Sequence, residues 1–304
     1  MSINNVTLCD YLFGRTLGKY YPLYLIYIYP KLIKYYMKIL KKIKVKSIFK
    51  FLFNMNINYD GCHIKNFNDI TNCISLLSEI FNIKINKDFI VFNYKDKLLK
   101  FMYGEPIRDI LLSLVEQFRL EQYSLISPKG FDVVDVGAYI GDSAIWFSLN
   151  GANHIYAFEP YPYAFQMAKI NVELNGIGNI TLVNAGVGAM REQIKIPNVV
   201  SGRYGALSVS SNDGVNVPIL TLEDIVHEYG INDALLKMDC EGCERAILSI
   251  DADVLRRFRY IIIEYDYVYL DLMHKLKEAG FKVKRWKRPR ISNGRITGII
   301  YAMR

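Results

Sequence analysis

Downstream of Lys129-Gly130, short apolar runs alternate with amphipathic stretches, and no other feature of the sequence constrains the fold as much. Such alternation of strand and helix is typical of a parallel sheet that is covered by helices on both faces. We therefore predict an α/β fold. The predicted strands are Asp132 to Val136, His154 to Phe158, Ile180 to Asn184, Leu235 to Met238 and Tyr260 to Glu264.

The intervening helices have recognisable ends. The segment from Pro162 to Asn175 begins with proline, and Gly176 follows it, which is a favourable residue beyond a helix C-terminus. The segment from Thr221 to Asp224 resembles a capping box, and Gly230 closes the helix after it. These end signals support the α/β assignment.

The end of the sequence predicts antiparallel pairing. The segments Phe281 to Trp286 and Thr297 to Met303 are strand-like, and a turn-rich linker with Asn293-Gly294 separates them. Together with the five earlier strands, they predict a mostly parallel, Rossmann-like sheet of seven strands whose final strand is antiparallel.

The first hundred residues differ in character. We expect a basic helical extension over 1–53, a small accessory region over 54–105 and the α/β domain over 106–304. The segment Lys31 to Phe53 has apolar residues at helical spacing, with most lysines off the apolar stripe. This basic amphipathic helix either lies on an anionic membrane or nucleic acid, or docks on its own domain and points its lysines at water.

The accessory region and the start of the α/β domain carry weaker signals. The segments Phe89 to Tyr94 and Leu98 to Met102 predict a hairpin around Lys95-Asp96-Lys97. A helix is expected from about Ile107 to Tyr123.

Charge is unevenly distributed along the chain. Ten basic residues and one acid lie within 1–53, and eight basic residues without an acid lie between Lys282 and Arg304. Because the net charge is +8, the middle of the chain carries about −9. An acidic centre suits a cationic cofactor, and basic ends suit anionic surfaces.

Five cysteines form no regular framework, so a disulfide-stapled secreted domain is not expected. Cys240 and Cys243 form one C-x-x-C, a spacing typical of zinc or redox sites, but no second ligand pair with zinc spacing is present, so we expect packing beside a loop in place of a metal or redox role. No run reaches the roughly 18 apolar residues that a membrane span needs. We expect a cytoplasmic protein, peripheral to a membrane if the basic helix binds one.

A glycine-containing loop follows the first of the five strands. Asp135 and Gly137 lie at its carboxyl end, and Ala138 and Gly141 lead into the next helix. Ligands in such sheets bind outside the carboxyl ends of the strands, and a glycine lets them approach the backbone. Asp142 either caps the helix or contacts the ligand.

The next two strands end in further candidate contacts. Glu159 follows the second strand about 20 residues beyond the glycine loop, where a carboxylate accepts hydrogen bonds from ribose hydroxyls. For an adenine ring we expect backbone groups of Asn184 and Ala185 at the third strand, with Tyr161 nearby.

Several of these elements resemble the FkbM-type methyltransferase family. They are Asp135-Val136-Gly137-Ala138 with Gly141, Phe158-Glu159-Pro160, Asn175-Gly176, Thr221-Leu222 with Asp224, Lys237-Met238-Asp239 with Glu241-Gly242 and Glu244, and Ile263-Glu264. The resemblance spans about residues 118–267 and leaves 1–90 uncovered. It implies a class I methyltransferase fold, S-adenosylmethionine as cofactor and O-methylation of a small molecule, often a sugar.

Three carboxylates are candidates for the chemistry. Asp239 ends the fourth strand beside the expected methyl group, so we expect it to position the substrate or cofactor. Glu241 or Glu264 is expected to act as the base. The alternative for Glu264 and Glu244 is an ion pair with Lys237 or Arg245.

Two other functions compete. Basic ends with nearby aromatic residues also suit an RNA or DNA methyltransferase, although the sequence lacks the Asn/Asp-Pro-Pro-Tyr/Phe element of amino-directed nucleic acid enzymes. A non-catalytic, methyltransferase-like adaptor is the other alternative. The acceptor is expected to be a small molecule or glycan.

Overall fold

The structure is a computed structural model that describes residues 41, 57–59, 62–64, 74–104, 107–197, 214–266, 268–285, 290–292 and 295–304. Contacts divide the chain into two units, Met1–Gln122 and Tyr123–Arg304. The domain limits predicted at residues 53 and 105 stay predictions. Apart from Lys41, the predicted basic helix lies outside the described residues.

The first unit contains small antiparallel sheets and helices. The predicted hairpin is confirmed and gains a third strand on one edge. The expected helix from Ile107 ends at Phe118, short of Tyr123, because the N–H groups of Arg119 and Leu120 both turn back to the carbonyl of Val115. The elements are β1 (Ile57–Tyr59), β2 (Cys62–Ile64), α6 (Ile74–Phe81), β3 (Lys84–Ile85), β4 (Phe89–Tyr94), β5 (Lys97–Met102) and α7 (Ile107–Phe118).

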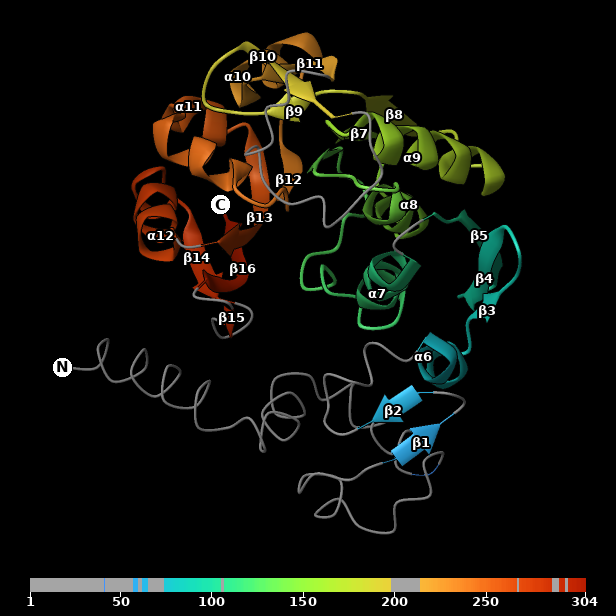
Figure 1. Cartoon of the computed structure of the whole chain (residues 1–304). Helices are drawn as coiled ribbons and strands as arrows, with labels where there is room; N and C mark the ends of the chain where they lie inside the picture. Colours follow the sequence, from blue (N-terminus) through green and yellow to red (C-terminus); the bar gives the residue numbers. More distant parts are fainter. Residues whose placement is uncertain are drawn as a thin grey trace, which may run out of the picture. The chain divides into compact units, whose positions relative to one another are not determined.

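A large sheet organises the second unit, coloured from green to red in Figure 1. Seven strands follow the order β14-β16-β13-β12-β6-β7-β8, and β15 pairs with β16 beside this row. Only β16 runs antiparallel to its neighbours within the row, as predicted. The strands are β6 (Val133–Val136), β7 (Ile155–Phe158), β8 (Ile180–Val183), β12 (Ala234–Met238), β13 (Phe258–Asp266), β14 (Lys282–Arg285), β15 (Arg290–Ser292) and β16 (Arg295–Met303).

Side chains alternate between the two faces of this sheet. Val134 and Val136 of β6 and Leu236 of β12 belong to a core that α10, η1 and α12 cover. Residues of opposite parity, such as Asp135, face the side on which α8 and α9 pack. The helices are α8 (Asp142–Leu149), α9 (Pro162–Leu174), α10 (Leu222–Glu228), the 3-10 helix η1 (Cys243–Ser249), α11 (Ala252–Leu255) and α12 (Tyr269–Glu278).

The capping box predicted before α10 is present: the Thr221 side chain accepts from the N–H of Asp224, and Asp224 accepts from the N–H of Thr221. A small second sheet was not predicted. Its strands are β9 (Gly186–Val187), β10 (Glu192–Ile196) and β11 (Val215–Leu220). Among the described residues, no helix combines the length and apolar character needed to cross a bilayer.

Candidate functional site

The predicted site lies where three neighbouring parallel strands end. The strands β12, β6 and β7 are adjacent in the sheet, and Asp239 and Glu159 directly follow β12 and β7. Asp135 lies within β6, one residue before its end. Because parallel strands present their carboxyl ends at one edge, all three carboxylates come to the same edge of the sheet.

Asp135 is part of a buried ion pair. It is 0% exposed, its Oδ1 lies 2.9 Å from Nζ of Lys237, and its Oδ2 accepts a 2.6 Å hydrogen bond from Ser143. Asp135 and Lys237 are register partners in β6 and β12, which explains the pairing. Both carboxylate oxygens are therefore engaged within the protein, and the predicted contact of Asp135 with a cofactor stays a prediction.

Lys237 links this ion pair to the glycine loop. Its Nζ donates to the carbonyl oxygens of Gly137 at 2.7 Å and of Val136 at 3.3 Å. Burial opposes the charged amine, but the carboxylates of Asp135 and Asp239 outweigh it and raise the pKa of Lys237. The partner of Lys237 is thus Asp135, whereas the alternative pairing of Glu244 or Glu264 with Arg245 stays a prediction.

The glycine loop is shaped by close approach of protein backbone. Gly137 has a φ of 80°, and a Cβ there would collide with the carbonyl oxygen of Asp239. The glycine therefore makes room for the chain after β12, and the approach of a ligand to this loop stays a prediction. Ala138 is buried, and its N–H donates to the carbonyl of Phe158 on β7.

The loop ends at Gly141, which is the N-cap of α8 with a φ of 83°. Asp142 is therefore inside the first turn of the helix, and the alternative that it caps the helix is wrong. Asp142 is nearly buried and electrostatically attracts Lys237.

Glu159 is a buried carboxylate at the tip of β7. Its Oε2 accepts a 2.7 Å hydrogen bond from the N–H of Tyr139, and its Oε1 accepts a 2.9 Å bond from the N–H of Tyr161. Burial raises its pKa to about 7, although these two N–H groups and the more distant Lys237 oppose the shift. A carboxylate has about four acceptor positions, so each oxygen can still accept one ribose hydroxyl.

The residues predicted for the adenine ring lie beside Glu159. Tyr161 is the N-cap of α9 and is half-buried. Asn184 uses its amide to donate to the carbonyls of Glu159 and Pro160, and Ala185 is fully buried. The Asn184 side chain thus holds the tips of β7 and β8 together, and adenine recognition by backbone groups stays a prediction.

Asp239 meets a residue that sequence reasoning missed. The hydroxyl of Tyr123 donates a 2.6 Å hydrogen bond to Oδ2 of Asp239. Asp239 and Glu264 both raise the pKa of Tyr123, after burial itself, so both charges act at this hydroxyl. In the sequence Tyr123 is only the expected end of a helix, and no motif singles it out.

The segment after Asp239 contains a disulfide. Cys240 and Cys243 are bonded to each other, with their Cα atoms 5.5 Å apart, and the prediction of packing beside a loop did not include this bond. Glu241, between them, is exposed and has a φ of 55°. Glu244 is buried and accepts from the N–H of Gly242.

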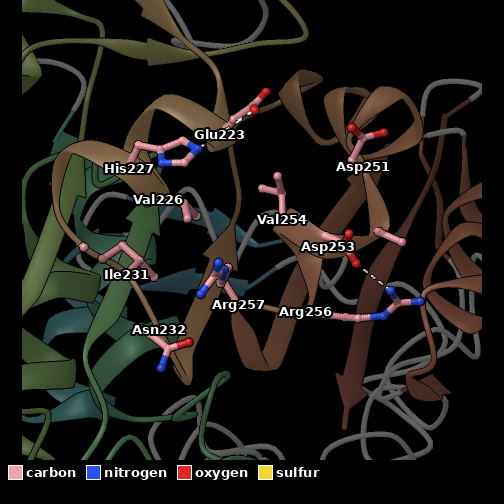
Figure 2. Close-up of a pocket in the computed structure, with 12 residues that line it drawn as sticks. Glu223, Val226, His227, Ile231, Asn232, Asp251, Asp253, Val254, Arg256 and Arg257 are labelled. Atoms are coloured by element: carbon pink, nitrogen blue, oxygen red, sulfur yellow. Dashed lines mark hydrogen bonds and ion pairs between the residues drawn. The ribbon is translucent and has the colours of Figure 1, made fainter.

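A separate cavity of about 640 Å³ lies at the opposite edge of the sheet. Figure 2 shows the residues that line it. Ile231 and Asn232, just before β12 begins, line it together with Val254 and Arg257. Asp239 follows the other end of β12, and none of the predicted site residues lines this cavity.

The strand tips fit a nucleoside cofactor that carries a positive charge. Glu159 keeps acceptor positions for ribose hydroxyls, while Asp239 and Glu264 bring negative charge to the neighbouring strands. Among the described residues, no group of three or more His, Cys, Asp or Glu side chains is arranged to hold a metal ion.

Several solved structures are similar to this chain at low identity. They include a putative transferase of Pyrococcus horikoshii (12% identity, 88% of this chain and 97% of that chain, TM-score 0.42), TYW2 of M. jannaschii in complex with AdoMet (14%, 72% and 87%, TM-score 0.39) and precorrin-6y C5,15-methyltransferase of Geobacter metallireducens GS-15 (16%, 67% and 95%, TM-score 0.37). No curated protein sequence matches the chain.

A family comparison identifies the domain itself. The family described as "Methyltransferase FkbM domain" matches residues 135–283, a range that contains the glycine loop, Glu159, Asp239 and Glu264. The sheet has the class I methyltransferase order, with β16 as its antiparallel strand. This chain is therefore an S-adenosylmethionine-dependent methyltransferase, and its residues 135–283 match the FkbM methyltransferase domain.

Proposed function

We propose that the chain methylates a hydroxyl oxygen of a small molecule or sugar. The observation that carries this proposal is the gathering of Asp239 and Glu264 around Tyr123, next to the glycine loop. When bound, S-adenosylmethionine supplies an electrophilic methyl group on a positively charged sulfur. A hydroxyl that attacks this methyl group must lose its proton, and a carboxylate at the same edge can accept it.

Each carboxylate has a distinct proposed role. Glu159 accepts hydrogen bonds from the ribose, and Asp239 stabilises the positive charge of the sulfonium and aligns the ligands. Glu264 or Glu241 takes the acceptor proton. Glu264 is half-buried, and its charge raises the pKa of Tyr123. Glu241 is instead exposed on the turn after β12. Because methyl transfer is an in-line displacement, alignment should supply most of the acceleration.

The test is transfer of a labelled methyl group from S-adenosylmethionine to a fractionated cell extract, with and without ribonuclease and deoxyribonuclease. We expect label in the small-molecule or glycan fraction, insensitive to both nucleases. Glu159→Ala should abolish cofactor binding. Glu264→Gln or Glu241→Gln, whichever removes the base, should keep cofactor binding and lose about 100-fold or more in turnover.

The control is Glu223→Gln, which changes a carboxylate in the cavity at the opposite edge of the sheet. It should leave turnover unchanged. If both Glu264→Gln and Glu241→Gln keep full turnover, a carboxylate base is excluded and the proposed mechanism fails.

An RNA or DNA acceptor is the alternative, and the basic ends of the sequence favour it. Label that disappears with ribonuclease or deoxyribonuclease, together with nucleic acid binding that weakens steeply with salt, would replace the proposal with this one. The cytoplasmic location, with the basic segment 31–53 on an anionic membrane, is a further part of the proposal. Fractionation of cells into soluble and membrane pools tests it.

A further inference from the structure

A buried tyrosine lies directly beside Asp239. Tyr123 is 1% exposed, and its hydroxyl donates to Oδ2 of Asp239 over 2.6 Å. The two residues are 116 positions apart in the sequence. Tyr123 precedes the family match, which begins at residue 135, so the match does not include it.

The Tyr123 ring is held in place by packing. It stacks on the ring of Phe147 from α8, with centroids 6.1 Å apart and planes 10° apart. Nζ of Lys237 lies 5.7 Å from the centroid of the same ring. A buried ring with these neighbours has little freedom to turn, so the position of its hydroxyl is well defined.

The hydroxyl of Tyr123 acts as a hydrogen-bond donor at all ordinary pH values. Burial raises the pKa of Tyr123 well above its usual value, and the charges of Asp239 and Glu264 raise it further. The phenol therefore keeps its proton and cannot serve as the base. What it can do is fix the direction of the carboxylate that it contacts.

The Tyr123 hydroxyl contacts Oδ2 of Asp239 and not Oδ1. Among the described residues, no hydrogen bond is made to Oδ1, and the side chain is half-buried at the edge of the sheet. Lys237 attracts Asp239 electrostatically, although its Nζ is directed at Asp135 and two backbone carbonyls. Without the tyrosine hydroxyl, the carboxylate would be free to turn toward this amine.

We propose that Tyr123 is a positioning residue of the methyl-transfer site, whose hydroxyl holds Oδ2 of Asp239 so that Oδ1 faces the positively charged cofactor. This inference rests on the role proposed above for Asp239. Tyr123, which lies outside the family match, would thus orient Asp239, which lies inside it.

The test compares the binding of S-adenosylmethionine and S-adenosylhomocysteine by calorimetry. The two ligands differ by one methyl group and by the positive charge on sulfur. The ratio of their dissociation constants therefore reports how well a negative charge is aimed at the sulfur, and it requires no acceptor. General damage to the fold would weaken the binding of both ligands equally and leave the ratio of their dissociation constants unchanged.

Tyr123→Phe removes only the hydroxyl and should lower the preference for S-adenosylmethionine by about fivefold or more. Asp239→Asn should lower it at least as much, and the double variant should lose no more than Asp239→Asn alone. Tyr156→Phe is the matched control, because Tyr156 lies in the middle of β7, and it should keep the ratio.

An unchanged ratio in Tyr123→Phe, with a reduced ratio in Asp239→Asn, would overturn the role of Tyr123 alone. An unchanged ratio in Asp239→Asn would instead overturn the role proposed for Asp239. If Tyr123→Phe does not fold, as judged by thermal unfolding, Asp239→Glu replaces it as the test. That variant keeps the charge but moves it by one methylene group, and a retained preference would contradict the proposal.

Discussion

At the scale of single residues, the site is built from charged groups whose partners are mostly backbone. Glu159 accepts two N–H groups, and Lys237 donates to two carbonyls of the glycine loop. Buried charges need such partners, since an unpaired one costs several kcal/mol. The same contacts fix the side chains before any ligand arrives, which is what alignment-based catalysis requires.

We predict that protonation of Glu159 changes the free energy of unfolding of the protein. Burial raises its pKa from 4.5 to about 7, so the folded protein holds the proton more tightly than the unfolded chain does. The stability gained from the protonated form is complete below about pH 4.5 and is lost as the pH rises through about 7. The free energy of unfolding of wild type minus that of Glu159→Gln should therefore fall between these pH values.

Chemical denaturation of both proteins across this pH range measures the difference. Other titrating groups are common to wild type and variant and cancel in the subtraction. A difference that is constant with pH would show that Glu159 titrates near its ordinary value. Glu159→Asp, which keeps the charge, should retain part of the pH dependence.

At the scale of elements, the site depends on how closely the glycine loop approaches the chain after β12. Gly137 lies against the carbonyl of Asp239, and the N–H of Asp239 donates back to the carbonyl of Val136 over 3.0 Å. Lys237 of β12 also donates hydrogen bonds to the carbonyl oxygens of Val136 in β6 and Gly137 in the loop. The strand tips are therefore joined into one unit by backbone contacts.

We predict that Gly137→Ala destabilises the protein far more than Gly130→Ala. Both glycines have a φ near 80°, 80° and 82° respectively, so both variants carry similar backbone strain. A Cβ at Gly130 meets nothing within 4 Å, whereas a Cβ at Gly137 collides with the Asp239 carbonyl. The difference in unfolding free energy should be about 2 kcal/mol or more, measured by urea denaturation. Equal losses would mean that β12 and the loop can move apart freely.

At the scale of the whole molecule, the predicted cofactor and catalytic residues all fall in one of the two contact units. The first of them is Asp135 and the last is Glu264, and the unit runs from Tyr123 to Arg304. Its sheet, covering helices and buried core also lie within these limits. The unit thus contains the elements that a class I fold needs to bury its sheet.

We therefore predict that residues 123–304, produced alone, fold and bind S-adenosylmethionine within about threefold of the affinity of the full chain, as measured by calorimetry. The physical reason is that no predicted cofactor contact comes from the first unit. The control is Tyr123→Phe within the same 123–304 protein, which should fold and have a lower preference for S-adenosylmethionine. Failure of 123–304 to bind would show that the first unit completes the site.

The sequence alone determined the order along the chain of the strands in the large sheet and the positions of their tips. The alternation of these strands with helices, the capping box before α10 and the final pair β14 and β16 all follow from local patterns, because such patterns depend on neighbouring residues. For the same reason the positions of Glu159 and Asp239 at strand ends could be predicted.

Only the tertiary structure decided which side chains meet. The pairing of Asp135 with Lys237 depends on the register between two strands a hundred residues apart, and the Tyr123 contact on a segment outside every motif. Position 137 likewise requires glycine because the order of the strands in the sheet brings the backbone carbonyl of Asp239 against it. Long-range register and packing have no local signal in one sequence, because they arise from the shape of the assembled sheet.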